Sequence, residues 1–148
     1  MKNFTDSENT KYIKLLEMVN KYESITNNLE KEQYFKSIIT YYPDITIDYL
    51  DNYWRSVDLE HFCTQYCLDK IDSLSDINSR NVIEEILNNK NCDEFLDKSI
   101  YLALKYSEFF EIKYGCPNGV FYNVVFENKV LTYDDVINVL NNNGPIYI

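Results

Sequence analysis

The chain has 148 residues, of which 45% are apolar, and its 14 basic and 24 acidic residues give a net charge of −10 at pH 7. This length is typical of a single domain, and the apolar content argues against an intrinsically disordered chain. Because nucleic acids and anionic membranes are bound mainly through Lys and Arg, the charge argues against both as partners and favours a basic protein instead.

The N-terminal third of the chain predicts two helices. Thr5 and Glu8 have the spacing of a capping box, in which a hydroxyl and a carboxylate satisfy each other's backbone amides. Apolar residues at helical spacing follow and predict a first helix over about residues 6–22. A second helix is expected over about residues 27–42. It ends there because Pro43 disfavours helical geometry in the residue before it.

Two further helices are predicted up to residue 67. Asp44 can cap a helix that runs to about Arg55, and Ser56 and Asp58 can begin the next one. That fourth helix carries an apolar stripe at positions i, i+3, i+4, i+7 and i+8, which is the pattern of a core-facing helix surface. The stripe consists of Leu59, Phe62, Cys63, Tyr66 and Cys67.

The middle of the chain predicts a short fifth helix at residues 82–87 and then a longer apolar helix. Residues 92–114 are apolar on nearly every side in their middle, at Ile100–Leu104 and again at Phe109–Phe110. A helix that is apolar all round is expected to be buried all round. We therefore expect residues 92–114 to form the central helix of the domain.

After Gly115 the residue types change. Val120–Phe126 is rich in branched and aromatic residues and predicts a strand, Glu127–Asn128 a tight turn, and Lys129–Leu131 a second strand. Thr132 with Asp135 predicts the start of a last helix, which ends at Gly144 and Pro145. The final residues 146–148 suggest a short edge strand.

These elements predict an α+β fold that is predominantly α. About six to seven helices surround the central apolar helix at 92–114, and a small C-terminal antiparallel hairpin completes the fold. We expect a single domain, 1–148, with a helical part at 5–114 and a hairpin plus helix at 119–148.

The sequence predicts a cytoplasmic protein. It has no apolar run of about 20 residues, the length needed to span a bilayer. Residues 1–10 lack the hydrophobic region of a signal peptide. In a reducing cytosol the four cysteines would be free thiols.

Metal binding and catalysis have few candidate residues. A structural zinc site needs four ligands, whereas His61, Cys63 and Cys67 supply three and Cys92 and Cys116 come from separate segments. We interpret Cys63 and Cys67 as small hydrophobic core residues, and His61 as solvent-facing. With one histidine and no nucleophile–base–orienter set, we expect no enzyme, no cofactor and no metal.

The acidic surface is the most informative feature. Between Tyr41 and Asp76 lie eight acids and two bases, interleaved with aromatic residues that are typical of binding hot spots. Partner binding is predicted for Asp44, Asp48, Tyr49, Asp51, Tyr53, Asp58 and Glu60. The alternative is that these acids form an ordinary solvated face and that the tyrosines belong to the core.

In size, charge and its acidic, aromatic surface, the chain resembles the small acidic cytosolic immunity proteins of bacterial toxin–immunity pairs, including those of contact-dependent inhibition. This resemblance of type implies a protein that binds a basic toxin domain, often a nuclease, and occludes its active site. Carboxylates at residues 44–58 would replace the phosphates held by the toxin's Lys and Arg. Tyr49, Tyr53 or Trp54 would fill apolar gaps at the centre of the contact.

Two other functions remain open. The first is a viral or phage inhibitor of a host factor, of a Bcl-2-like or DNA-mimicking type, since viral Bcl-2-like bundles have a comparable length and a central apolar helix. The second is a small zinc- or thiol-dependent enzyme that uses His61, Cys63 and Cys67. The oligomeric state is left undetermined by the sequence.

Overall fold

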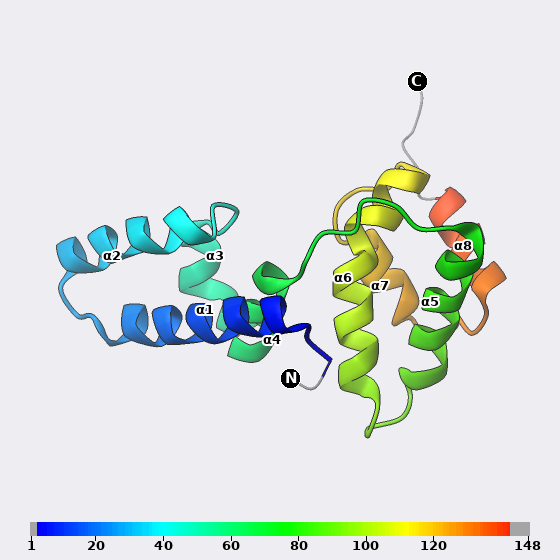
Figure 1. Cartoon of the computed structure of the whole chain (residues 1–148), viewed down its shortest axis with the longest axis horizontal. Helices are drawn as coiled ribbons and strands as arrows, with labels where there is room; N and C mark the ends of the chain where they lie inside the picture. The colour runs from blue at the N-terminus through cyan, green and yellow to red at the C-terminus, as the bar shows by residue number, and fades with distance from the viewer. Residues whose placement is uncertain (1–2, 143–148) are drawn as a thin grey trace. The chain divides into compact units, whose positions relative to one another are not determined.

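The computed structural model describes residues 3–142, and the chain divides into two compact units, Met1–Asp69 and Lys70–Ile148. Each unit has a hydrophobic cluster of its own. The described residues form eight α-helices and one 3-10 turn (Figure 1). The predominantly helical prediction is therefore confirmed. The sequence placed the internal boundary of a single domain between residues 114 and 119, whereas the division seen here falls after Asp69.

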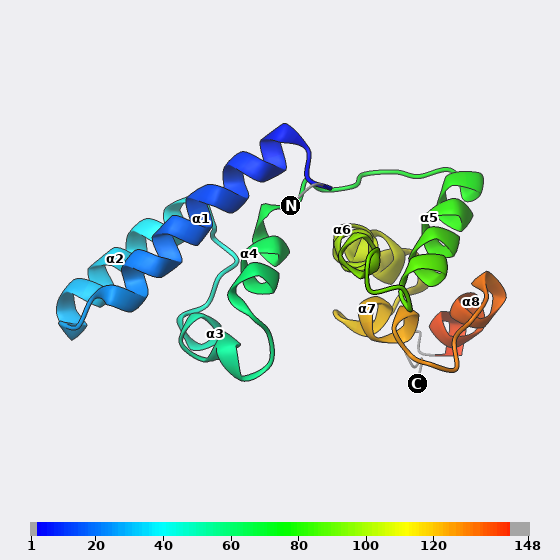
Figure 2. The ribbon, with the colours of Figure 1, turned by 90° about the horizontal axis from the view of Figure 1, so that it is seen from below.

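The first unit contains four helices and the 3-10 turn. They are α1 (Asp6–Ser24), α2 (Asn28–Tyr41), α3 (Ile47–Asn52), η1 (Tyr53–Arg55) and α4 (Leu59–Cys67). Helix α1 packs against both α2 and α4, and α1 and α2 lie side by side as a helical hairpin (Figures 1 and 2).

Most helix starts in this unit follow the predicted caps. Thr5 and Glu8 form the complete capping box, and the Asn27 side chain accepts the first amides of α2. Helix α3 is shorter than predicted. Asp44 lies in a turn in which the Ile45 amide bonds to the Tyr42 carbonyl, and Thr46 caps the helix instead.

The predicted stripe of α4 faces the core of the first unit. Phe62, Cys63 and Cys67 are fully buried, which confirms that both cysteines are core residues. The Phe62 ring lies 4.5 Å from that of Tyr53, and aromatic pairs at such distances add to the energy of apolar burial.

Lysine–tyrosine contacts join α1 to α2. In each contact the ammonium of one helix lies over a ring of the other, an arrangement that contributes about 0.5–1 kcal/mol at exposed sites. The three pairs are Lys14–Tyr41 at 3.1 Å, Lys21–Tyr34 at 5.0 Å and Lys31–Tyr22 at 4.6 Å from nitrogen to ring centroid.

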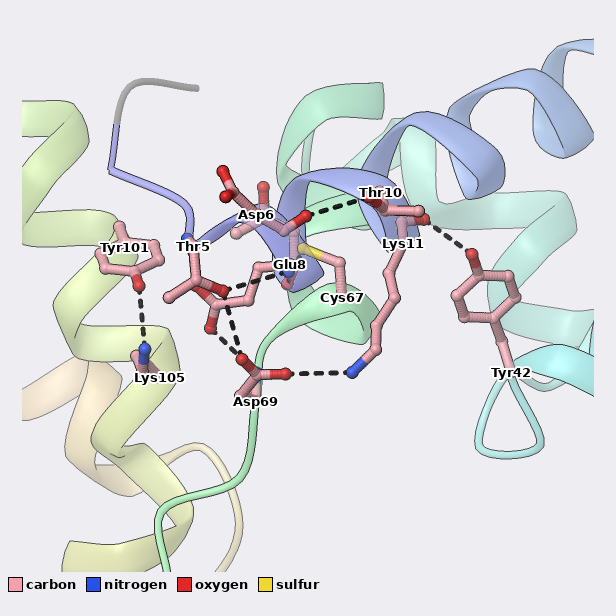
Figure 3. A network of polar contacts seen from close by, with 11 residues as sticks. Thr5, Asp6, Glu8, Thr10, Lys11, Tyr42, Cys67, Asp69, Tyr101 and Lys105 are labelled. Carbon is pink, nitrogen blue, oxygen red and sulfur yellow. Dashed lines mark hydrogen bonds and ion pairs between the residues drawn. The ribbon is translucent and has the colours of Figure 1, made fainter.

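A buried carboxylate ties the start of α1 to the end of α4 (Figure 3). Glu8 is fully buried, and its two oxygens accept the backbone amides of Thr5 at 3.0 Å and Asp69 at 2.9 Å. The Asp69 side chain in turn accepts bonds from the Thr5 hydroxyl and, at 3.0 Å, from the Lys11 ammonium. Residues at opposite ends of the unit's sequence are thereby held together.

Replacing Glu8 by Ala should lower the free energy of unfolding of the first unit by about 2 kcal/mol, because each buried polar group left without a partner costs about 1–3 kcal/mol. Urea unfolding followed by the fluorescence of Trp54, the single tryptophan, measures this unit. The control is Glu17→Ala, an exposed position of the same helix. Equal stability of the two variants would show that the Glu8 bonds contribute nothing.

The second unit contains the remaining helices, α5 (Asp76–Asn89), α6 (Leu96–Tyr114), α7 (Val120–Val125) and α8 (Tyr133–Asn142). Helix α6 packs against the other three, so the predicted apolar helix is central to this unit and not to the whole chain. It is not buried on every side, since Ile112 is 73% exposed. Helix α5 begins at Asp76, earlier than predicted, because Ser75 caps it.

The predicted hairpin is wrong. Residues 120–125 are the helix α7, residues 129–131 form a loop, and residues 3–142 contain no strand. The branched and aromatic side chains fill the core instead, and Phe121 stacks on Phe110 at 4.7 Å. The start of the last helix is confirmed, with Thr132 and Asp135 bonding to each other's backbone amides, whereas its predicted end at Gly144 and Pro145 lies outside the described residues. The suggested edge strand at 146–148 lies outside the described residues.

Buried charges hold both ends of α7. At its start, the Glu111 carboxylate accepts the Phe121 amide at 3.0 Å. At its end, the Lys90 ammonium donates to the carbonyl oxygens of Val125, Glu127 and Val130 at 3.0, 2.8 and 2.5 Å. A negative group at the N-terminus and a positive group at the C-terminus both favour a helix.

Replacing Lys90 by Met should release the end of α7. The three carbonyl oxygens lose a shared donor, so the amides of residues 120–130 should exchange with solvent at least about tenfold faster, as expected for a local loss of about 1.4 kcal/mol. Hydrogen exchange read by mass spectrometry measures this. The control is Lys129→Met, which changes an exposed lysine in the loop after α7 and should leave hydrogen exchange unchanged.

Candidate functional site

All seven predicted partner-binding residues lie in the first unit, between the turn before α3 and the first turn of α4. Five of them are exposed acids, which we call the acidic surface: Asp44, Asp48, Asp51, Asp58 and Glu60. Tyr49 is half-buried. Tyr53 is only 4% exposed and packs in the core, so it does not offer its ring to a partner.

The acidic surface extends along the unit and is not gathered at one point. Asp51 accepts the Tyr22 hydroxyl near the end of α1. Burial, and then the charges of Glu60 and Asp58 among others, raise the pKa of Tyr12 in the first half of that helix. Ten residues separate the two tyrosines, or about 15 Å at 1.5 Å per helical residue. Burial, and then the charges of Tyr49 and Asp44, raise the pKa of Tyr66 in α4. A partner that met all five acids would therefore cover an extended area.

The charge of the first unit is strongly uneven. Residues 42–69 carry six acids and one base, whereas residues 1–41 carry six acids and six bases. The excess of negative charge in this unit thus comes entirely from residues 42–69.

Two of the acids also have structural roles. Asp58 caps α4 by accepting the His61 amide at 2.8 Å. Asp51 accepts the Tyr22 hydroxyl at 2.7 Å. Burial, followed by this bond and the charge of Asp51, raises the pKa of Tyr22 well above its usual value, so the phenol remains a donor. These bonds fix the positions of the two carboxylates.

Of the three rings that the sequence suggested for the centre of the contact, Trp54 is the exposed one. It is 64% exposed, and its indole nitrogen donates to the Asp51 carbonyl oxygen at 3.0 Å. Tyr53 faces inward, where its hydroxyl donates to Glu23 at 2.5 Å. The aromatic character of this segment was visible in the sequence, but which of the two adjacent rings faces outward depends on the 3-10 turn η1.

A cleft of about 390 Å³ lies beside Trp54 in the first unit. Its walls come from α1, from α2 and from the α3–η1 segment. The lining residues are Tyr22, Glu23, Lys31, Leu50, Asp51, Tyr53 and Trp54. Glu23 and Lys31 were missed from the sequence because they belong to helices that only the fold brings beside α3.

The thiols and the histidine are arranged for packing. Burial, as the main cause, raises the pKa of both Cys63 and Cys67 to about 12, so both remain neutral thiols. His61 is half-buried and not solvent-facing as predicted, and burial lowers its pKa. Among residues 3–142, no three His, Cys, Asp or Glu side chains are grouped to hold a metal ion.

Comparison with known proteins finds no relative: no protein-family model matches the chain, and neither a curated protein nor a solved structure is similar to it. Within the described part of the chain, no helix has the length and apolar character to cross a membrane. The function must therefore be argued from the acidic surface and the cleft.

The single histidine provides a direct test of this geometry. Burial lowers the pKa of His61 and the charge of Asp58 opposes the shift. The ring should therefore titrate below the ordinary pKa of about 6.5. In an Asp58→Asn variant it should titrate lower still, because the opposing charge is gone. NMR titration of the single imidazole measures both values. A value at or above 6.5 would contradict the burial of His61.

Proposed function

We propose that this chain is an inhibitory binding protein that captures a basic protein, in particular a cognate toxin domain such as a nuclease, and covers its active site. The observation that carries the proposal is the excess of six acids over one base in residues 42–69, spread along the first unit. That segment also presents Trp54, a residue type enriched in binding hot spots. Such an immunity-like role requires no catalytic residue and no cofactor.

In the proposed mechanism, carboxylates of this chain would take the place of the phosphates of the partner's substrate. Lys and Arg groups that hold the phosphates of a nuclease substrate would meet the carboxylates of Asp44, Asp48 and Glu60 instead. Complementary potentials raise the association rate at low salt, and central anchors determine how long the complex lasts. Trp54 is the expected anchor, in place of the Tyr53 side chain that the fold buries.

An affinity capture from the native host tests the proposal. The wild-type protein should retain a basic protein at low salt and lose most of it near 0.5 M salt, where screening shortens to a few ångströms, about 4 Å. The charge-neutralised variant D44N/D48N/E60Q should retain at least tenfold less. The captured protein should then lose its own activity when the wild-type chain is added.

The matched control is E17Q/E30Q/E32Q, which removes the same charge from exposed positions of α1 and α2. It should capture the partner nearly as well as wild type. Equal capture by both triple variants, or a captured protein that is itself acidic, would contradict binding through the acidic surface.

One observation favours the alternative of a viral inhibitor that binds a host factor through an apolar groove. The second unit has a hollow of about 490 Å³. Its apolar lining residues are Ile71, Leu74, Phe109 and Ile112, and four charged residues, Lys70, Asp72, Glu108 and Lys113, complete the lining. Binding there would depend on apolar burial and would persist at high salt. The same salt series therefore separates the two functions.

A further inference from the structure

The cleft beside Trp54 combines two exposed carboxylates with one exposed aromatic ring, that of Trp54. Its other lining residues include Lys31 and the buried Tyr22 and Tyr53. Glu23 comes from the end of α1, and Asp51 and Trp54 come from the α3–η1 segment. The hollow of about 390 Å³ is within the range of small-ligand pockets, about 300–1,000 Å³. It is large enough to receive a side chain of another protein.

The two carboxylates are held in place and keep acceptor capacity. Asp51 receives the Tyr22 hydroxyl on one oxygen, and Glu23 receives the Tyr53 hydroxyl on one oxygen. An ionised carboxylate has about four lone-pair sites, so each can accept further N–H groups. Because the tyrosine hydroxyls already restrict these two side chains, the carboxylates lose less conformational freedom when a ligand binds.

The chain's own cations show which chemistry these rings accept. The ammonium of Lys31, a lining residue, lies 4.6 Å from the Tyr22 ring centroid. The guanidinium of Arg55 lies 5.2 Å from the Trp54 ring. Both are cation–π contacts. The contact of Arg55 shows that the exposed Trp54 ring accepts a guanidinium, whereas Lys31 places a positive charge of the chain itself in the cleft, beside the two carboxylates.

We propose that this cleft binds an arginine side chain of the basic partner, with Trp54 stacking on the guanidinium and Glu23 and Asp51 accepting its N–H groups. The assignment rests on the proposed function, which supplies a basic partner. Arginine fits better than lysine because its planar guanidinium both stacks on an aromatic face and donates in pairs to carboxylates. On binding, it would replace the contact of Arg55 with the indole ring.

The single tryptophan makes the test direct. N-acetyl-arginine amide should change the Trp54 fluorescence saturably, with a dissociation constant of about 1–10 mM, as expected for one side chain. N-acetyl-citrulline amide has the same shape without the charge and should cause no saturable change. N-acetyl-lysine amide should bind more weakly than the arginine compound. Equal effects of the arginine and citrulline compounds would overturn the proposal.

Variants locate the binding. Glu23→Gln combined with Asp51→Asn keeps an acceptor for each tyrosine but removes both charges, and should weaken binding of the arginine compound at least about tenfold. The control pair D44N/E60Q removes the same charge elsewhere on the unit and should change it less than about twofold. Circular dichroism melting confirms that both pairs fold. Equal affinities of the two pairs would place the arginine outside the cleft.

The capture and arginine-binding experiments together distinguish a failure of the arginine assignment from a failure of the proposed function. If wild type and E23Q/D51N capture the same basic partner equally while D44N/D48N/E60Q does not, the acidic surface is used and the cleft is not. If the arginine compound binds in the cleft but no basic protein is captured, the proposed function fails instead, and the cleft is a site for a small guanidinium or amine ligand.

Discussion

Within each of the two units, buried charges fix the ends of helices. Glu8 accepts the amides of Thr5, the N-cap of α1, and of Asp69, and in the second unit Glu111 and Lys90 hold the two ends of α7. Each charge loses its hydration on burial and regains several bonds to backbone groups that a helix end leaves unpaired. Burial raises the pKa of Glu111, while the backbone bonds it accepts act in the opposite direction. The folds thus depend on a few specific polar contacts in addition to apolar burial.

Local signals were sufficient to predict most of the helices. The Thr5–Glu8 capping box, the stop at Pro43 and the cap at Asp58 all act within one helical turn, and the structure has helices that begin or end there. The α7 segment could not be predicted in this way. Its branched and aromatic residues favour a strand, but Lys90, which is 35 residues away from Val125 in sequence, stabilises the end of a helix. Here tertiary contacts override the local preference.

In the candidate site, too, local sequence predicts some features, whereas others depend on packing between helices. That the acids of residues 44–60 are exposed followed from their charge alone. The inward position of Tyr53 did not, because helical spacing allows several adjacent rings to face the core and the 3-10 turn selects one. Glu23 and Lys31 reach the cleft from α1 and α2. Their role depends on packing between helices, which periodicity within one segment does not report.

Contacts of the lysines in the first unit also bear on the excess of negative charge in residues 42–69. Lys14, Lys21 and Lys31 lie over tyrosine rings between α1 and α2, and Lys11 is paired with Asp69. The first three contacts join the two helices of the hairpin, and Lys11 joins α1 to the residue that follows α4 closely. Residues 42–69 have Arg55 as their one base. Asp69 is paired with Lys11 and Asp51 shares the cleft with Lys31, whereas Asp44, Asp48 and Glu60 are exposed acids of a segment with one base. The proposed capture of a basic partner depends on the field of these three carboxylates.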